Sequence, residues 1–291
     1  MNHSEQNQPS VSVVLGSGSV KCSAALGMFH VLEREGIDVD LIVGCSAGSI
    51  FGTLLAMGMT AKEAEVAATR LWTPEVTKKR SRRSLLSILF PKQLGFDEEF
   101  GMLDDTLIQE RLQQALGDKQ FTDTTIPLYI TATDFHTGEM VVLQEGKLRD
   151  AIRASISIPF MFKPYKVNGR LLIDGFMSDS LPIAPAIQNG GNIILAMGFE
   201  TAYNTQFRHI GHFASQMTSI MKNNLLKARF AFNTAVHHEE VITILPALDK
   251  DIKRFDIEKI PHIIAEGERA TEAQLPYIRR LLESKLLEKQ S

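Results

Sequence analysis

A serine stands between two glycines where an apolar segment leads into a predicted helix. Residues 42–52 read IVGCSAGSIFG, which places Ser46 at the centre of Gly44-x-Ser46-x-Gly48. A G-x-S-x-G pattern between a strand and a helix is typical of a nucleophile elbow, in which small neighbours permit a tight turn that projects the hydroxyl. Ser46 is therefore the candidate nucleophile, and the rest of the chain must supply a base, oxyanion donors and a substrate site.

Two kinds of side chain are candidates for the base. An α/β-hydrolase uses a histidine late in the chain, and five are available: His209, His212, His237, His238 and His262. None has a distinctive local context, and only one full strand-helix unit precedes Ser46, whereas that fold normally places several strands ahead of its elbow. The other candidate is Asp174, which ends an apolar segment and is followed by Gly175. A partly desolvated carboxylate beside Ser46 would have a raised pKa and accept the hydroxyl proton directly.

The oxyanion donors are expected in residues 15–27, LGSGSVKCSAALG. A small-residue turn between a strand and a helix N-terminus offers free amides and a favourable dipole for developing negative charge. Gly18 and Ser19 are the candidate donors, and Lys21 is a cation that either attracts a phosphate headgroup or anchors the loop. The glycines and the lysine also suggest a phosphate loop, but the full Walker spacing with its Lys-Ser/Thr pair is missing.

The elements that must position these residues alternate between strands and helices. Short segments rich in β-branched residues predict strands at 11–16, 40–45, 126–134, 139–144, 169–174, 192–199 and 241–247. Apolar residues at helical spacing predict helices at 22–36 and 47–58, and near 61–72, 103–116, 205–235 and 261–288. This alternation predicts an α/β fold with a parallel sheet covered on both faces, and it places Ser46 and Asp174 at one edge of that sheet.

Length and composition narrow the class of protein. The chain has 291 residues, of which 44% are hydrophobic, and we expect a polar disordered tail over 1–10 and a single domain over 11–291. A net charge of −3 gives no bulk attraction to nucleic acid. The two cysteines, Cys22 and Cys45, resemble neither a disulfide framework nor a metal cluster, which fits a reducing cytoplasm. No apolar run reaches about eighteen residues, so membrane contact is expected to be peripheral.

Residues 77–96, TKKRSRRSLLSILFPKQLGF, combine a basic run with an apolar run. One interpretation is a solvated charged turn that leads into a core helix. The other is a cap over the site, or a surface whose cations meet anionic lipid headgroups while its Leu and Phe side chains insert beneath them.

Several blocks of the chain resemble the patatin-like phospholipase family, particularly its bacterial members related to neuropathy target esterase. Besides the glycine-rich loop near residue 16, these blocks are GIDVDLIVGCSAGSIFG, GMLDDTLIQERL, ITATDFHTGE and IRASISIPFMFKPYKVNGRLLIDGFMSDSLPI. In that family the G-x-S-x-G serine is the nucleophile and the aspartate of a D-G-G/A motif is the base, which map to Ser46 and Asp174. The resemblance implies a three-layer α/β sandwich with a central, mostly parallel sheet, and hydrolysis of fatty-acyl esters in lipids without a metal or an organic cofactor.

Two departures from the family pattern affect this interpretation. Where the family usually has G-G-G-x-R/K-G, residues 17–22 read SGSVKC, and a Cβ at Ser19 restricts positive φ. The aspartate motif reads Asp174-Gly175-Phe176, and the Phe176 ring is expected to shape or partly fill the acyl pocket. A catalytically impaired lipid-binding or regulatory protein, or a histidine-dependent esterase, remain the alternatives to a phospholipase or lysophospholipase. The sequence decides neither the headgroup nor the oligomeric state.

Overall fold

The computed structural model describes residues 10–71, 73–81, 98, 100–200, 203, 210–236, 240–249 and 252–288. The predicted tail, apart from Ser10, lies outside these residues. The strands of the described part form one sheet: β1 (Val11–Leu15), β2 (Leu41–Cys45), β3 (Leu128–Asp134), β4 (Met140–Leu143), β5 (Tyr165–Val167), β6 (Arg170–Asp174), β7 (Ile193–Met197) and β8 (Glu240–Ile244). Every strand predicted from the sequence is present, and β5 was not predicted.

The sheet is parallel through its centre and antiparallel on one side. The strand order is β5-β6-β3-β2-β1-β7-β8, and β4 pairs with β3. The strands β3, β2, β1, β7 and β8 pair in parallel, whereas β3 pairs antiparallel with both β4 and β6. The mostly parallel sheet expected from the sequence is thereby confirmed. β5 and β6 also pair antiparallel, as a hairpin whose turn, Asn168-Gly169, has φ of 49° and 80°.

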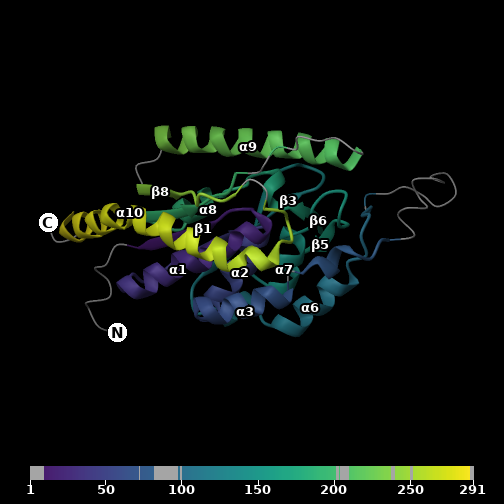
Figure 1. The fold of residues 1–291 in the computed structure, drawn as a ribbon, viewed down its shortest axis with the longest axis horizontal. Helices are drawn as coiled ribbons and strands as arrows, with labels where there is room; N and C mark the ends of the chain where they lie inside the picture. Colours follow the sequence, from purple (N-terminus) through teal and green to yellow (C-terminus); the bar gives the residue numbers. More distant parts are fainter. Residues whose placement is uncertain are drawn as a thin grey trace.

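Helices cover both faces of this sheet (Figure 1). In chain order they are α1 (Ala24–Glu35), α2 (Ala47–Ala56), α3 (Ala61–Leu71), α6 (Thr106–Leu116), α7 (Leu148–Ser155), α8 (Ala184–Gln188), α9 (Ile210–Val236) and α10 (Ile260–Glu288). Figure 1 shows α9 along one side of the sheet and α1, α2 and α10 on the other. This is the three-layer sandwich expected from the sequence; α7 and α8 were not predicted.

Alternate residues of the central strands enter two separate cores. Val13 and Leu15 of β1 pack with the buried residues of α1, α2 and α10. Val14 between them packs on the opposite face with Leu181 and with Leu226 of α9. Because both faces are buried, these strands are mostly apolar on both faces, without a regular polar alternation, which is why they were readily found in the sequence.

None of the helices in the described ranges combines the length and the apolar character that crossing a lipid bilayer requires.

Candidate active site

Ser46 occupies a tight turn between β2 and α2. Its backbone has φ 53° and ψ −129°, a conformation rare for a residue with a side chain and one that stores strain. The flanking glycines are required by close contacts. A Cβ on Gly44 would lie 2.6 Å from the Ser49 Cα, and a Cβ on Gly48 would lie 2.3 Å from the Leu15 carbonyl oxygen. The elbow geometry predicted from Gly44-x-Ser46-x-Gly48 is thus present.

Asp174 reaches Ser46 because β2 and β6 run toward each other along one edge of β3. β2 runs parallel to β3 and ends with Cys45 opposite Thr131, while β6 runs antiparallel and ends with Asp174 opposite Ala132. Both strands use the same edge of β3, since β4 occupies the other edge over residues 130–133. The sequence placed Asp174 near Ser46 for a different reason, a shared carboxyl edge of parallel strands. The prediction that Asp174 lies close to Ser46 is correct, but β6 runs antiparallel to β3 and not parallel to it.

A short hydrogen bond joins the two side chains. The Ser46 hydroxyl donates to Oδ2 of Asp174 over 2.7 Å, with Ser46 only 7% exposed and Asp174 fully buried. The other carboxylate oxygen, Oδ1, accepts the N–H of Phe176 at 3.1 Å. Gly175 is needed between them, because a Cβ there would lie 2.5 Å from the Thr131 carbonyl oxygen. The carboxylate is therefore held by the turn that follows β6 and aimed at the serine.

Burial dominates the electrostatics of Asp174. Desolvation of its carboxylate raises the pKa from 3.8 to about 7, although the hydrogen bonds from the Phe176 amide and the Ser46 hydroxyl and the charges of Lys222 and Arg254 oppose the shift. A group with this pKa exchanges its proton readily near neutral pH, which is the property required of a general base.

The glycine-rich loop lies beside the elbow, since β1 is the neighbour of β2 in the sheet. Ser19 adopts φ 57° despite its Cβ, and its hydroxyl donates to the Arg254 carbonyl oxygen at 2.6 Å. Gly18 packs so tightly that a Cβ there would lie 2.5 Å from the Phe199 ring. The Gly18 N–H lies beside the Cys22 sulfur and acts on the pKa of that thiol, and within the described residues no backbone carbonyl outside a helix or strand accepts the Ser19 N–H. The role of these two amides as oxyanion donors stays a prediction.

Lys21 and Phe176 occupy different kinds of position. The Lys21 ammonium donates to the Glu200 carbonyl oxygen at 3.2 Å, and partial burial lowers the pKa of this lysine. Lys21 thus ties the loop to the segment after β7, which matches the anchoring role among its two predicted ones. Phe176 is partly exposed and its backbone serves Asp174. A contact of Lys21 with a headgroup and of the Phe176 ring with an acyl chain stay predictions.

Two cations at the site were not predicted from the sequence. Lys222 of α9 donates through Nζ to the Ser17 carbonyl oxygen at 2.6 Å. Arg254 follows β8, and its charge, like that of Lys222, acts on Asp174. The sequence held only a weak signal for Lys222, namely its place on a helix next to Ser219, Asn223 and Leu226, which the structure shows to be buried.

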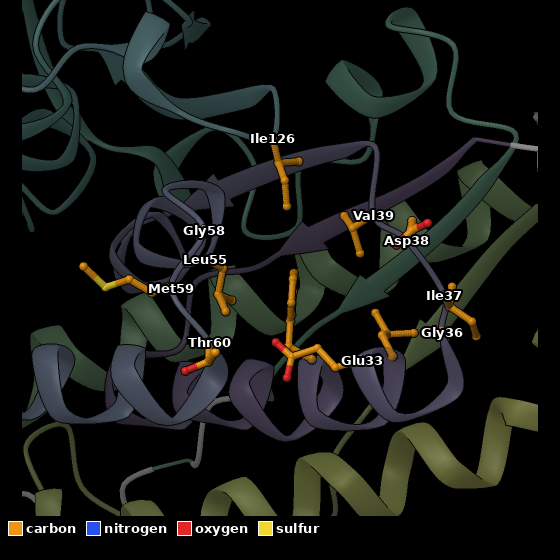
Figure 2. Close-up of a pocket in the computed structure, with 12 residues that line it drawn as sticks. Glu33, Gly36, Ile37, Asp38, Val39, Leu55, Gly58, Met59, Thr60 and Ile126 are labelled. Carbon is orange, nitrogen blue, oxygen red and sulfur yellow. The ribbon is translucent and has the colours of Figure 1, made fainter. Parts of the chain in front are cut away.

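A surface cavity of about 250 Å³ lies away from this site. Its lining comes from the end of α1, the turn after α2 and the segments that precede β2 and β3, and Glu33, Val39, Thr60 and Ile126 surround the hollow in Figure 2. It is therefore at the amino ends of the parallel strands, whereas Ser46 follows the carboxyl end of β2.

The late histidines do not account for the serine's hydrogen bond. Of the five, the structure describes only the side chain of His262, which is exposed and lies 3.7 Å from Asp249. The side chains of His209, His212, His237 and His238 lie outside what is described. The group that the Ser46 hydroxyl contacts is a carboxylate.

Comparison with known proteins places this geometry in a family. The model of the family described as "Patatin-like phospholipase" matches residues 13–187, more than half of the chain, and the match includes both Ser46 and Asp174. The chain belongs to the patatin-like phospholipase family. The resemblance seen in the sequence is confirmed.

The relatives of this patatin-like chain are mostly longer proteins. An uncharacterized NTE family protein of Mycobacterium bovis is 32% identical over 191 residues, which cover 66% of this chain and 49% of that protein. Lysophospholipase NTE1 of Cryptococcus neoformans is 28% identical over 204 residues, which cover 69% of this chain and 12% of that protein. The chain thus spans about half or less of these relatives. The solved structure of VipD from Legionella pneumophila shares the fold, with a TM-score of 0.52 and 16% identity over 96% of this chain and 67% of that one.

Proposed function

We propose that this patatin-like chain is a serine acylhydrolase that cleaves fatty-acyl esters of lipids, with Ser46 as nucleophile and Asp174 as base. The observation that carries the proposal is the 2.7 Å hydrogen bond from a strained serine hydroxyl to a fully buried carboxylate. Membership of a phospholipase family and the lysophospholipase among the relatives support a lipid ester as substrate. Phospholipids and lysophospholipids carry different acyl esters, and either ester would react with the same pair, Ser46 and Asp174.

The reaction proceeds in two acyl transfers. Ser46 Oγ bonds to the ester carbonyl carbon while its proton passes to Asp174, and the tetrahedral intermediate then expels the alcohol, which takes that proton. A water molecule gives its proton to Asp174 and attacks the acyl-serine. Collapse of the second intermediate returns the proton to Ser46 Oγ and releases the fatty acid. The amides of Gly18 and Ser19 would hold the negative oxygen in both steps.

Hydrolysis of lipids by the wild type and by Ser46→Ala tests this proposal. We expect fatty acid release from a panel of phospholipids and lysophospholipids with the wild type alone. An inactive wild type that still binds the same lipids would instead support the lipid-binding or regulatory alternative. Loss of activity on replacing His262, together with retained activity in Asp174→Ala, would support the histidine-dependent esterase.

The rate should depend on pH through Asp174. Only the ionised carboxylate accepts the serine proton, and burial raises its pKa to about 7, so kcat/KM should rise with pH up to about 7 and fall roughly tenfold per pH unit below 6. A profile on a soluble p-nitrophenyl ester measures this. An acidic limb near pH 4 would show that the carboxylate is solvated in the working enzyme.

Residues 77–96 are proposed to meet anionic lipid surfaces. Lys78 and Lys79 are exposed, the first beside Glu75 at 3.0 Å and the second beside Asp104 at 2.7 Å. Arg80 is exposed as well. Arg82, Arg83 and the apolar residues that follow them lie outside the described residues, so the proposal rests on the sequence.

Replacing Lys78, Lys79, Arg80, Arg82 and Arg83 by glutamine should weaken binding to anionic vesicles and slow the hydrolysis of vesicle lipid. Each cation near such a surface contributes about 1 kcal/mol, screened over about 8 Å at physiological salt. Turnover of p-nitrophenyl butyrate should stay within about threefold, because that ester needs no surface. The matched control replaces two exposed lysines elsewhere, Lys62 of α3 and Lys166 of β5. Equal losses on both substrates would indicate a structural role instead.

A further inference from the structure

A cation from α9 contacts the glycine-rich loop one residue before the proposed oxyanion donors. The Lys222 ammonium lies 2.6 Å from the Ser17 carbonyl oxygen, although α9 is some two hundred residues later in the chain. The residue as a whole is partly exposed, yet its ammonium is buried. Burying an ammonium is costly unless it is hydrogen-bonded and faces negative charge. This lysine therefore has a specific task at the loop.

The geometry of the peptide bond indicates that task. The Ser17 carbonyl and the Gly18 N–H belong to one planar, trans peptide unit, so the two groups point in opposite directions. A cation that fixes the carbonyl also fixes the direction of the N–H. It polarises the unit as well, since a hydrogen bond accepted by the oxygen strengthens the one donated by the nitrogen.

We propose that Lys222 is a positioning residue that orients and polarises the Ser17–Gly18 peptide so that the Gly18 N–H serves the oxyanion. This deepens the proposed function and rests on it. The loop needs such support because its sequence departs from a glycine-only pattern: Ser19 holds φ 57° and is tied to the Arg254 carbonyl oxygen. Lys222 thus holds the Ser17–Gly18 peptide, while the Arg254 carbonyl oxygen holds the Ser19 side chain on the other side of Gly18.

The surroundings of Lys222 make this role sensitive to pH. Its ammonium is influenced by Cys22, Cys45, Asp174 and Arg254, and burial lowers its pKa to about 8. Burial raises the pKa of Cys22 to about 12 and that of Cys45 well above 9, so neither thiol titrates with the lysine. Asp174 titrates near 7. Activity should therefore fall again above about pH 8, as Lys222 loses its proton.

Kinetics of three variants on p-nitrophenyl butyrate provide the first test. Lys222→Met should lower kcat roughly 10- to 100-fold with little change in KM, somewhat less than the loss of an oxyanion donor itself. Lys222→Arg should recover most of that rate and remove the alkaline limb, because a guanidinium does not titrate below pH 12. Lys227→Met is the matched control on the exposed face of α9 and should behave as wild type. Thermal melts of each variant identify any that fail to fold.

The second test observes the peptide directly. Ser17-Gly18 is the only Ser-Gly pair in the sequence. Cell-free protein with ¹³C-carbonyl serine and ¹⁵N-glycine therefore gives a single HNCO peak for the Ser17 carbonyl and the Gly18 N–H. That peak should shift with a midpoint near pH 8 in the wild type, the pKa of Lys222, and stay constant from pH 7.5 to 9.5 in Lys222→Arg.

The outcomes separate this inference from the proposed function. A wild type that hydrolyses the ester, with Ser46→Ala inactive but Lys222→Met at wild-type kcat, would overturn the role of Lys222 and leave the acylhydrolase intact. An alkaline limb unchanged in Lys222→Arg would also overturn it. Equal inactivity of the wild type and Ser46→Ala would contradict both proposals, whatever the HNCO peak shows.

Discussion

Replacing Ser46 by alanine is expected to lower ester hydrolysis by roughly 10⁴-fold or more, and replacing Asp174 by asparagine by a similar factor. The double variant should be scarcely slower than either single variant. Residues that act as one unit give strongly non-additive losses, because removal of either partner already abolishes the step that both perform. Initial rates on p-nitrophenyl butyrate, with product formation followed over hours, have the range to measure this. Losses that multiply would show that the two side chains act independently.

Folding of the asparagine variant serves as the control. Burial raises the pKa of Asp174 in the folded chain to about 7, above that of the unfolded chain, so the fold favours the neutral acid. That stabilising contribution is complete below about pH 4 and is lost as the pH rises through 7. Asparagine stays neutral throughout, so Asp174→Asn should be at least as stable as the wild type at pH 8. If Asp174→Asn is unfolded, its inactivity does not report on catalysis, and the pH profile of the wild type then tests the role of Asp174.

Replacing Arg153 by methionine is expected to lower the free energy of unfolding by about 3–5 kcal/mol. Arg153 of α7 is 1% exposed and donates to Oδ2 of Asp105 at 2.6 Å and to the Ser157 hydroxyl at 2.7 Å. Its guanidinium also lies 5.4 Å from the centre of the Phe162 ring. Removal of the cation leaves the buried Asp105 carboxylate, which Lys163 approaches only to 3.9 Å, with a much weaker charge partner.

Urea unfolding of two further variants gives this prediction its contrast. Arg149→Met, on the same helix, removes a cation that pairs with the exposed Asp118 at 3.5 Å and should cost about 1 kcal/mol or less. The double change Arg153→Met with Asp105→Leu should recover part of the loss, because no buried charge is then left unpaired. A similar small loss for Arg153→Met and Arg149→Met would contradict the buried pair. The pair also bears on the site, since the Asp174 N–H donates to the Ser157 carbonyl oxygen.

Much of the fold could be predicted because its signals are local. β1, β2 and β7 are short and mostly apolar, with β-branched residues, and Ser46 lies in a five-residue pattern whose glycines are required by close contacts. The short strand β5 was missed, yet its turn, Asn168-Gly169, is a strong hairpin signal. Recognising that turn would have predicted that β6 runs antiparallel to β5. α7 was missed because it buries Arg153, a residue that sequence patterns assign to the surface.

The remaining features of the site depend on contacts between distant segments. Asp174 is aimed at Ser46 by two strands that meet end to end along β3, and nothing in the sequence near either residue encodes that meeting. Lys222 reaches the Ser17 carbonyl from α9, and the Arg254 carbonyl oxygen reaches Ser19 from the segment after β8. Both are ordinary cations in the sequence. Their proximity to the loop exists only once the layers have packed.

Covalent labelling by a fluorophosphonate tests the central claim most directly, because the reagent reports an activated serine without any choice of substrate. Peptide mass spectrometry should find the adduct on Ser46 of the wild type, none at that position in Ser46→Ala, and labelling slowed by a hundredfold or more in Asp174→Asn, as expected when the activating base is lost. An adduct on another serine, or a labelling rate at Ser46 that is unchanged in Asp174→Asn, would contradict a nucleophile activated by Asp174.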